Sequence, residues 1–482
     1  MRRRGFLGLV ALALAGCATG ADGNTGTLAF TNPLRIPPVL DPEPGPDGVK
    51  RYPLALRPGE TEFLPGRTTR TWGVNGTYLG PTLRARLGDR VAMTVTNLLP
   101  EASTLHWHGM RLPAAMDGGP HQTIAAGGTW IPQWTVDQPA ATTWYHPHPH
   151  GETAEHVYRG LAGMFIVDDE HSAELPHTYG VDDVPLIVQD KVFDAEGQLK
   201  EDFGGTWGLL GDQILVNGTH GPFFEVKASR TRFRILNGAN AHVFTLGFAD
   251  NRKFQVIASD AGLLPEPVTV DRVELSPGER FEVVVEFKPG ETVLLKGFSG
   301  DSAIEEGDYD ILELRAAPTL AQSPALPATL PAPRRTEPGP KTRTFRLGGT
   351  NINGKDMDIT RIDEVVPAGA HEVWEVDNIT FDHNFHVHEV AFRILDIDGE
   401  EPPPHLRGPK DTVYVPGKTK VRLAVEFGHH TDPKTPYMYH CHILKHEDKG
   451  MMGQFVIVEP GTEDQTPRTL SLTGEGHSHH GG

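Results

Sequence analysis

Short apolar or alternating runs, bounded by Gly, Pro, Asn and Asp, recur along nearly the whole chain. Residues 90–95 and 280–287 are two examples, and both have the length and the alternation of a β-strand. Apolar residues at helical spacing are scarce. This pattern predicts an all-β protein built from sandwiches. A chain of 482 residues is too long for one ordinary core and suits about three domains of roughly 150 residues each.

A weak internal repeat supports three related domains. Asn-Gly pairs at residues 75–76, 217–218 and 353–354 open the three units, and each pair fits a tight hairpin turn. The Pro- and Ala-rich stretch 316–341 indicates an extended linker between the second and third units. We therefore place domain one at 27–175, domain two with its linker at 176–340, domain three at 341–465 and a His-containing tail at 466–482.

The first 26 residues have the features of an export signal followed by a tether. Arginines at positions 2–4 precede the apolar run 9–14, a pattern typical of twin-arginine signals and too short to span a membrane as a helix. The sequence around Cys17 resembles a bacterial lipobox, in which Cys17 would be lipidated; an ordinary signal with a chance cysteine is the alternative. We expect an exported protein, periplasmic or at the cell surface, anchored to the membrane through Cys17.

Cysteine content and charge narrow the chemistry. Cys17 and Cys441 are the only two cysteines, so lipidation of the first and metal binding by the second leave no disulfide. The formal charge of −19 becomes −22 when the three arginines of the signal are removed (−19 − 3). Such an acidic surface disfavours nucleic acid as a partner and mildly favours cationic substrates. We expect a monomer.

The segment from His440 to His446, followed by Met451, carries the most informative chemistry. In an extended backbone Cys441 points to one face, while His440 and His442 point to the other. A thiolate, the imidazole of His446 and the thioether of Met451 are donors of a blue-copper electron-transfer site, which needs one further imidazole. The two faces of this segment therefore predict two different metal sites.

Three upstream segments, residues 105–109, 145–151 and 383–388, each contain a His-x-His pair, which places two imidazoles on one face of an extended backbone. With the pair at 440 and 442 they supply eight imidazoles, the number that a three-copper cluster uses. His383 lies an odd number of residues before His386 and His388, so its side chain points to the opposite face of an extended backbone. It is therefore free to complete the Cys441 site. One cysteine with ten histidines does not fit the patterns of structural zinc sites.

These motifs resemble the multicopper oxidases, a family that includes laccases, ferroxidases and bacterial copper-efflux oxidases. The resemblance covers nearly all of the mature chain and is closest to the bacterial copper-efflux and laccase-like group, through residues 144–151 and 446–452. It implies three consecutive cupredoxin-like Greek-key β-sandwich domains. It also implies four coppers per chain, one of type 1, one of type 2 and two of type 3, with a copper-free second domain, in which His242 has no partner histidine.

The resemblance assigns the copper ligands residue by residue. Type 1 copper would be held by His383, Cys441, His446 and Met451, and type 2 copper by His106 and His386. The type 3 pair would be held by His108, His146, His148, His388, His440 and His442. Strand parity alone leaves open whether His148 or His150 is a ligand; the family pattern favours His148, with His150 in an outer layer.

The same resemblance implies an oxidase in which Cys441 receives single electrons and dioxygen is reduced to water. Asp117 and Glu447 match carboxylates that handle protons near the cluster. A small reductant, either Cu(I), a phenol or an aromatic amine, would dock at an exposed imidazole edge of His446 or His383. The alternative from a different class is a non-catalytic cupredoxin scaffold or copper-binding protein of the cell envelope.

Overall fold

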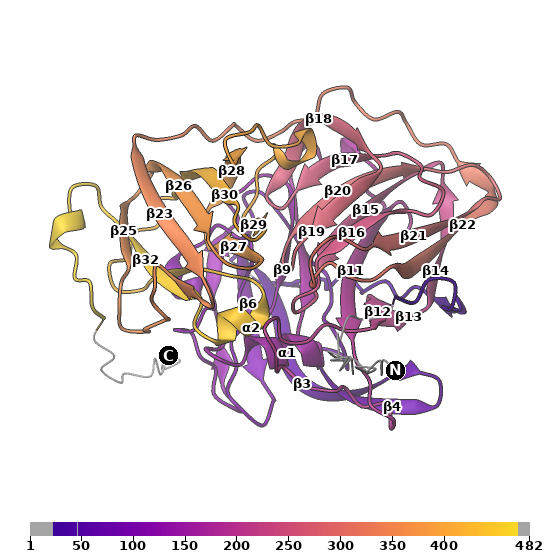
Figure 1. Ribbon diagram of the computed structural model, residues 1–482, viewed down its shortest axis with the longest axis horizontal. Helices are drawn as coiled ribbons and strands as arrows, with labels where there is room; N and C mark the ends of the chain where they lie inside the picture. Colours follow the sequence, from indigo (N-terminus) through magenta and orange to yellow (C-terminus); the bar gives the residue numbers. More distant parts are fainter. Residues whose placement is uncertain (1–22, 46, 471–482) are drawn as a thin grey trace, which may run out of the picture.

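The computed structural model describes residues 23–45 and 47–470, and its regular structure is almost entirely β-strand (Figure 1). The only α-helices in these residues are α1 (Thr153–Arg159) and α2 (Leu444–Asp448). Three β-sandwiches pack together, with the first sandwich below the other two in Figure 1. The prediction of an all-β fold of three sandwiches is confirmed. Cys17 and the histidines of the tail lie outside the described residues.

The first sandwich encloses a core around Leu56, Trp107 and Phe165. Its strand β3 (Lys50–Leu64) pairs in parallel with β6 (Arg90–Asn97), and β5 (Leu83–Arg86) pairs in parallel with β10 (Gly163–Asp168). The larger sheet contains β2 (Glu43–Pro44), β3 (Lys50–Leu64), β4 (Arg67–Val74), β6 (Arg90–Asn97), β7 (Thr129–Trp130) and β8 (Gln133–Thr135), and the smaller sheet contains β5 (Leu83–Arg86), β9 (Ala141–Tyr145) and β10 (Gly163–Asp168).

The second sandwich has a core rich in Val, Leu and Phe, including Phe233 and Phe281. One sheet contains β1 (Asn32–Pro33), β14 (Pro222–Ala228), β16 (Phe244–Phe248), β19 (Arg272–Leu275), β21 (Thr292–Phe298) and β22 (Tyr309–Ala321). The other contains β11 (Asp183–Lys191), β12 (Gln213–Val216), β13 (Thr219–His220), β15 (Arg230–Asn237), β17 (Phe254–Ser259), β18 (Gly262–Val270) and β20 (Arg280–Glu286).

The third sandwich packs its two sheets around Trp374, Phe385 and Tyr439. One sheet contains β23 (Lys341–Gly348), β24 (Asn351–Ile352), β26 (His371–Asn378), β28 (Ala391–Ile397) and β30 (Lys420–Glu426). The other contains β25 (Glu364–Pro367), β27 (His383–Val387), β29 (Thr412–Val415), β31 (Tyr437–His440) and β32 (Met452–Val458).

The predicted turn between β12 and β13 is present, whereas the predicted linker is correct only in part. Asn217 and Gly218 join β12 to β13 with positive φ angles of 51° and 67°, as a tight two-residue hairpin requires. The predicted linker begins too early, because residues 316–321 continue strand β22 along β14. The remaining residues, 322–340, cross the top of the molecule in Figure 1. The domain boundaries near 175 and 340 stay predictions.

The first and third sandwiches meet where α1 and α2 lie side by side (Figure 1). The carboxylate of Asp448 in α2 accepts hydrogen bonds from the N–H groups of Thr153 and Ala154, at 2.8 and 3.0 Å, at the start of α1. These bonds satisfy two of the unpaired N–H groups that every helix start leaves. Of the helices in the described residues, none is long and apolar enough to cross a membrane.

Candidate metal centre

His383, Cys441 and His446 come together inside the third sandwich. His383 begins β27, Cys441 follows the end of β31, and His446 lies in α2. The Cys441 Sγ lies 3.6 Å from the Nδ1 of each imidazole, the two Nδ1 atoms are 3.1 Å apart, and all three side chains are fully buried. Burial raises the pKa of the Cys441 thiol to about 12, so the thiol keeps its proton until a cation replaces it. One sulfur and two imidazole nitrogens converging on one point fit a copper ion.

Met451 lies beside this group. Its carbonyl oxygen accepts a hydrogen bond from the N–H of Cys441 at 3.1 Å. Its side chain is fully buried in the same apolar core as Cys441. Met451 is therefore adjacent to the Cys441 group, where a weak axial thioether ligand is expected.

The predicted exposed imidazole edge is absent. His383 and His446 have no exposed surface. The ring of Trp207 lies 5.6 Å from that of His446, and the ring of Phe381 lies 4.9 Å from that of His383. The Nε2 of His446 lies 3.0 Å from the carbonyl oxygen of Thr206, to which it donates a hydrogen bond. The prediction was wrong because a loop of the second sandwich, distant in sequence, covers the site.

Eight further histidines form one buried cluster between the first and third sandwiches. The ring of His108 stacks on that of His386 at 3.7 Å, and the ring of His106 stacks on that of His388 at 3.9 Å. None is more than 1% exposed; they are His106, His108, His146, His148, His386, His388, His440 and His442. Several sets of three lie within 4.8 Å of one another, measured between their donor atoms. The structure thus brings all the predicted cluster histidines together, whereas His150 is exposed.

Hydrogen bonds orient these imidazoles. The Nδ1–H groups of His106, His146 and His386 donate to the carbonyl oxygens of Asp117, Pro147 and Asp411, at 2.9, 2.8 and 2.8 Å. Their Nε2 atoms have no partner in the described part of the chain. His108 is reversed, because its Nε2 contacts Asp411 and its Nδ1 is the nitrogen without a partner. Fixing one ring nitrogen by a hydrogen bond leaves the lone pair of the other for a metal.

The protonation state of the cluster favours metal binding as well. Burial, with the neighbouring imidazoles, holds the pKa of His108, His146, His386 and His388 well below the usual value. Burial likewise lowers the pKa of His442 to about 3. Neutral imidazoles with free lone pairs are the form that binds copper, so these residues fit that metal.

Asp117 and Glu447 contact different histidines of the cluster. The Asp117 Oδ2 lies 2.7 Å from the Nδ1 of His388. Glu447 lies between two histidines, with Oε1 3.3 Å from the Nδ1 of His148 and Oε2 3.2 Å from the Nδ1 of His440. Burial opposes ionisation of Glu447, but the imidazoles of His148 and His440 outweigh it and hold its pKa well below the usual value.

Sequence reasoning missed Asn384, which connects the two sites. Its Oδ1 accepts a hydrogen bond from the N–H of His442 at 2.6 Å and lies 3.5 Å from the Cys441 Sγ. Its Nδ2 donates to the carbonyl oxygen of Pro277 in the second sandwich at 2.8 Å. A single asparagine between two histidines carries no signal of its own, so only the contacts identify it.

Solved structures with this fold include copper enzymes. A bacterial laccase-like multi-copper oxidase CueO from Ochrobactrum sp. has 38% sequence identity and a TM-score of 0.82, and the match covers 88% of this chain and all of that one. A multicopper oxidase from Campylobacter jejuni, described as a metallo-oxidase, has 26% identity and a TM-score of 0.79, with 90% of this chain and 98% of that one covered.

Sequence relatives carry two kinds of name. The multicopper oxidase mco of Staphylococcus haemolyticus is 35% identical over 437 residues, covering 88% of this chain and 92% of the relative. The cell division protein FtsP of Escherichia coli is 34% identical over 473 residues, covering 95% and 99%. Three family models, each described as multicopper oxidase, match residues 56–172, 187–293 and 326–461. Together with the converging histidines and Cys441, these matches place the chain in the multicopper oxidase family.

Proposed function

We propose that this protein is an active oxidase that takes single electrons from a small reductant and reduces dioxygen to water. One observation carries the proposal. Cys441, with two imidazole nitrogens 3.6 Å from its sulfur, is bonded through the backbone to His440 and His442, which belong to the eight-histidine cluster. A site that accepts electrons is thereby joined covalently to a site large enough to bind several metal ions.

The proposed ligand sets come from the family pattern, and the convergence of these donors supports them. His383, Cys441, His446 and Met451 would hold one type 1 copper, and His106 and His386 one type 2 copper. The remaining six histidines of the cluster would hold the type 3 pair. When bound, the four coppers supply the one-electron steps and the dioxygen chemistry.

The residues of the chain manage protons and exclude water. Glu447 is fully buried and contacts His148 and His440, so it is positioned to accept a proton and pass it toward the cluster. Asp117 contacts the Nδ1 of His388 at 2.7 Å and is the second candidate for such a role. Burial of every cluster histidine keeps bulk water away, which strengthens these electrostatic contacts.

The reductant would approach through the loop that covers His446. Trp207 contacts both His446 and Phe381, at ring distances of 5.6 and 4.9 Å, and it is partly exposed. An aromatic surface above a buried ligand suits phenols and aromatic amines, and the acidic surface suits Cu(I). For location, we propose export to the periplasm or cell surface with a lipid anchor at Cys17.

A second candidate is a non-catalytic protein of the cell envelope, which the relatives named for cell division favour. The complete set of buried donors argues for the oxidase, because a scaffold has no need for neutral imidazoles with free lone pairs.

Oxygen consumption by the copper-loaded protein separates these functions. The reductants are Cu(I) and a dimethoxyphenol in separate assays, with Cys441→Ser as the control. We expect uptake with at least one reductant and none in the variant, which should also lose its blue colour while keeping a type 2 copper signal. A higher kcat/KM for one reductant assigns the substrate class. No uptake with either reductant supports the non-catalytic protein.

A further inference from the structure

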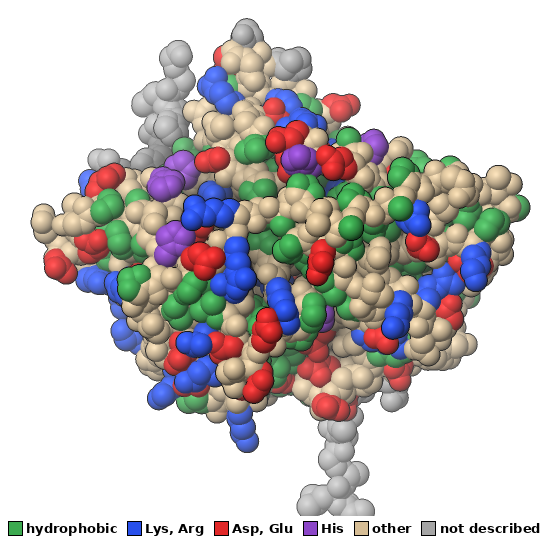
Figure 2. Space-filling view, turned by 90° about the horizontal axis from the view of Figure 1, so that it is seen from above, with side chains coloured by type: hydrophobic (Ala, Val, Ile, Leu, Met, Phe, Trp, Pro, Cys, Tyr) green, Lys and Arg blue, Asp and Glu red, His purple; other side chains and the backbone are tan. Residues whose placement is uncertain are grey.

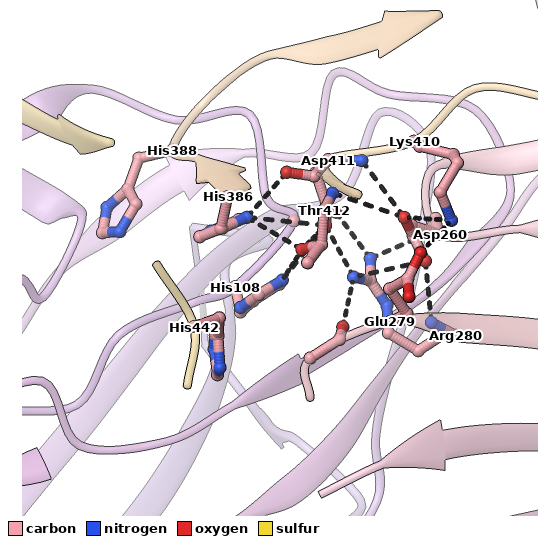
Figure 3. Close-up of polar contacts among 12 residues, drawn as sticks. His108, Asp260, Glu279, Arg280, His386, His388, Lys410, Asp411, Thr412 and His442 are labelled. Carbon is pink, nitrogen blue, oxygen red and sulfur yellow. Dashed lines mark hydrogen bonds and ion pairs between the residues drawn. The ribbon is translucent and has the colours of Figure 1, made fainter. Parts of the chain in front are cut away.

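A buried cluster of charges lies next to the histidines, at the boundary between the second and third sandwiches (Figure 3). Asp260, Glu279 and Arg280 come from the second sandwich, and Lys410 and Asp411 come from the segment before β29. None of these side chains is more than 4% exposed. Buried charges are costly unless they are paired, so a cluster of five needs an explanation.

The centre of this cluster is a two-point ion pair between Arg280 and Asp411. The Arg280 Nη1 lies 2.7 Å from Asp411 Oδ1, and Nη2 lies 2.6 Å from Oδ2. Two parallel bonds between a planar guanidinium and a carboxylate fix the orientation of both groups. The side chain of Asp411 therefore cannot turn without breaking both contacts.

Asp411 in turn holds two cluster histidines, as Figure 3 shows. Its Oδ1 accepts a hydrogen bond from the Nε2 of His108 at 3.1 Å. Its carbonyl oxygen accepts one from the Nδ1 of His386 at 2.8 Å. The contact of Asp411 with His108 explains why the Nδ1 of His108, rather than its Nε2, has no hydrogen-bond partner.

The rest of the cluster anchors Arg280. The backbone N–H of Arg280 donates to Asp260 Oδ1 at 2.7 Å. Lys410 Nζ in turn contacts the carboxylates of Asp260 and Glu279 at 2.9 and 3.0 Å. Three carboxylates face two cations, so the cluster carries one formal negative charge beside the histidines. That excess charge suits a neighbouring site for several metal cations.

We propose that Arg280 is a positioning residue of the copper site: the second sandwich, which has no copper ligand of its own, sets the orientation of His108 and His386 through Asp411. The idea rests on the copper cluster proposed above. On this inference the second sandwich contributes to metal loading and does not only separate the other two sandwiches. Removing the ion pair should weaken copper binding about 10–100-fold, the usual effect of losing a contact that orients a metal ligand.

The test removes both charges together, so that neither is left buried without a partner. The double variant Arg280→Met/Asp411→Asn is compared with Arg234→Met/Asp183→Asn. Arg234 is a matched control, because it is 2% exposed and pairs with Asp183 through two bonds, but the ion pair does not contact a cluster histidine. Copper per chain, the EPR signal of type 2 copper and the unfolding temperature with and without copper are measured for both variants and the wild type.

We expect the copper-free forms of both double variants to unfold at similar temperatures. Only the variant at Arg280 should lose copper and change its type 2 signal, and Arg280→Lys with Asp411 intact should restore part of both. Equal copper content and unchanged EPR in the two double variants would overturn the inference. A wild-type protein that binds no type 2 copper would instead refute the proposed function, so the two failures are distinguishable.

A separate feature of the surface points to a ligand site away from the histidines. A pocket of about 240 Å³ opens between the linker, β18 and β28, and four arginines line it: Arg334, Arg335, Arg393 and Arg407. Figure 2 shows the molecule from this upper side, with several Lys and Arg side chains near the middle of the face. Among the described residues, only Arg407 has a carboxylate within ion-pair distance, Glu401 at 2.9 Å. The other three, Arg334, Arg335 and Arg393, lack such a partner among the described residues, which is unusual in a chain with a formal charge of −19.

We propose that this pocket binds a small organic oxyanion. Guanidinium groups match the planar oxygens of a carboxylate, sulfonate or phosphate, and apolar residues including Leu263 and Ile394 offer a wall for a ring. The volume lies below the range of about 300–1,000 Å³ that is usual for drug-sized ligands, so it suits a smaller ligand of about one ring.

Calorimetric titration of the full-length protein tests this site. The probes are benzenesulfonate, benzoate, phenyl phosphate and inorganic phosphate, with benzyl alcohol as the uncharged control. Arg335→Ser/Arg393→Ser is compared with Arg57→Ser/Arg70→Ser, which removes two arginines exposed on the first sandwich. We expect at least one ring-bearing anion to bind in the millimolar range or tighter, with at least tenfold loss only in the pocket variant. Binding no stronger than that of benzyl alcohol, equal loss in both variants, or binding of inorganic phosphate alone would overturn the proposal.

Discussion

Replacing Asn384 by Ala should weaken both the folded state and the Cys441 site. The side chain is fully buried. Its Oδ1 accepts the N–H of His442 at 2.6 Å, and its Nδ2 donates to Pro277 at 2.8 Å and to Ser276 Oγ at 3.1 Å. Alanine would leave the His442 N–H and the Pro277 carbonyl oxygen buried without partners. Each such group costs about 1–3 kcal/mol, so for the two groups we expect a total loss of about 2–6 kcal/mol in the free energy of unfolding.

The matched control is Asn97→Ala in the first sandwich. Asn97 is equally buried, and its Nδ2 donates to Glu101 and Ile124 at 2.8 Å, while its Oδ1 accepts the N–H of Leu99 at 3.0 Å. Both variants lose a comparable set of hydrogen bonds, but only Asn384 lies near Cys441 and bridges two sandwiches. Both variants should therefore lose stability, whereas only Asn384→Ala should change the copper spectrum.

The assay combines urea unfolding of the copper-free protein with the visible spectrum of the copper-loaded protein. We expect the blue absorption of Asn384→Ala to shift or fall, because the amide lies 3.5 Å from the sulfur that binds the metal. That of Asn97→Ala should match the wild type. A loss below about 1 kcal/mol in Asn384→Ala would contradict the reasoning on buried partners. An unchanged spectrum would contradict the proposed link between Asn384 and the Cys441 site.

Two further predictions concern buried ionisable groups. Glu447→Gln keeps the shape of the side chain but removes its charge between His148 and His440. The kcat for oxygen reduction should therefore fall about 100-fold at unchanged copper content. Activity within threefold of the wild type would exclude a role of Glu447 in proton transfer. Lys191 is buried against Tyr158, and burial lowers its pKa from 10.5 to about 7 despite the nearby Asp190. Between these two pKa values the unfolded chain holds a proton on Lys191 that the folded protein lacks. The free energy of unfolding should therefore rise by about 2 kcal/mol as the pH increases from 7 to 9. Urea unfolding at the two pH values should show this rise in the wild type and not in Lys191→Met; equal slopes would contradict the assigned pKa.

Patterns within single segments were read correctly from the sequence. Alternating apolar runs predicted strands because side chains of a strand alternate between faces, and that periodicity is a local property of the backbone. The same alternation of side chains placed Cys441 on the opposite face from His440 and His442. It did so although β31 ends at His440 and the backbone beyond it is irregular. The donors also needed no tertiary information, since thiolate and imidazole bind copper wherever they lie.

Contacts between segments were decided only by the tertiary structure. Trp207 covers His446, Asn384 reaches Pro277, and Arg280 fixes Asp411 across boundaries between sandwiches. Nothing in the residues around these positions marks them, because their roles depend on which surfaces of separate domains pack together. The strands, the donor types and the face on which each donor lies are therefore encoded within single segments of the chain. Packing between distant segments decided which nitrogen of His108 is free and how far the Cys441 site is shielded from solvent, since burial and orientation arise only when the three sandwiches assemble.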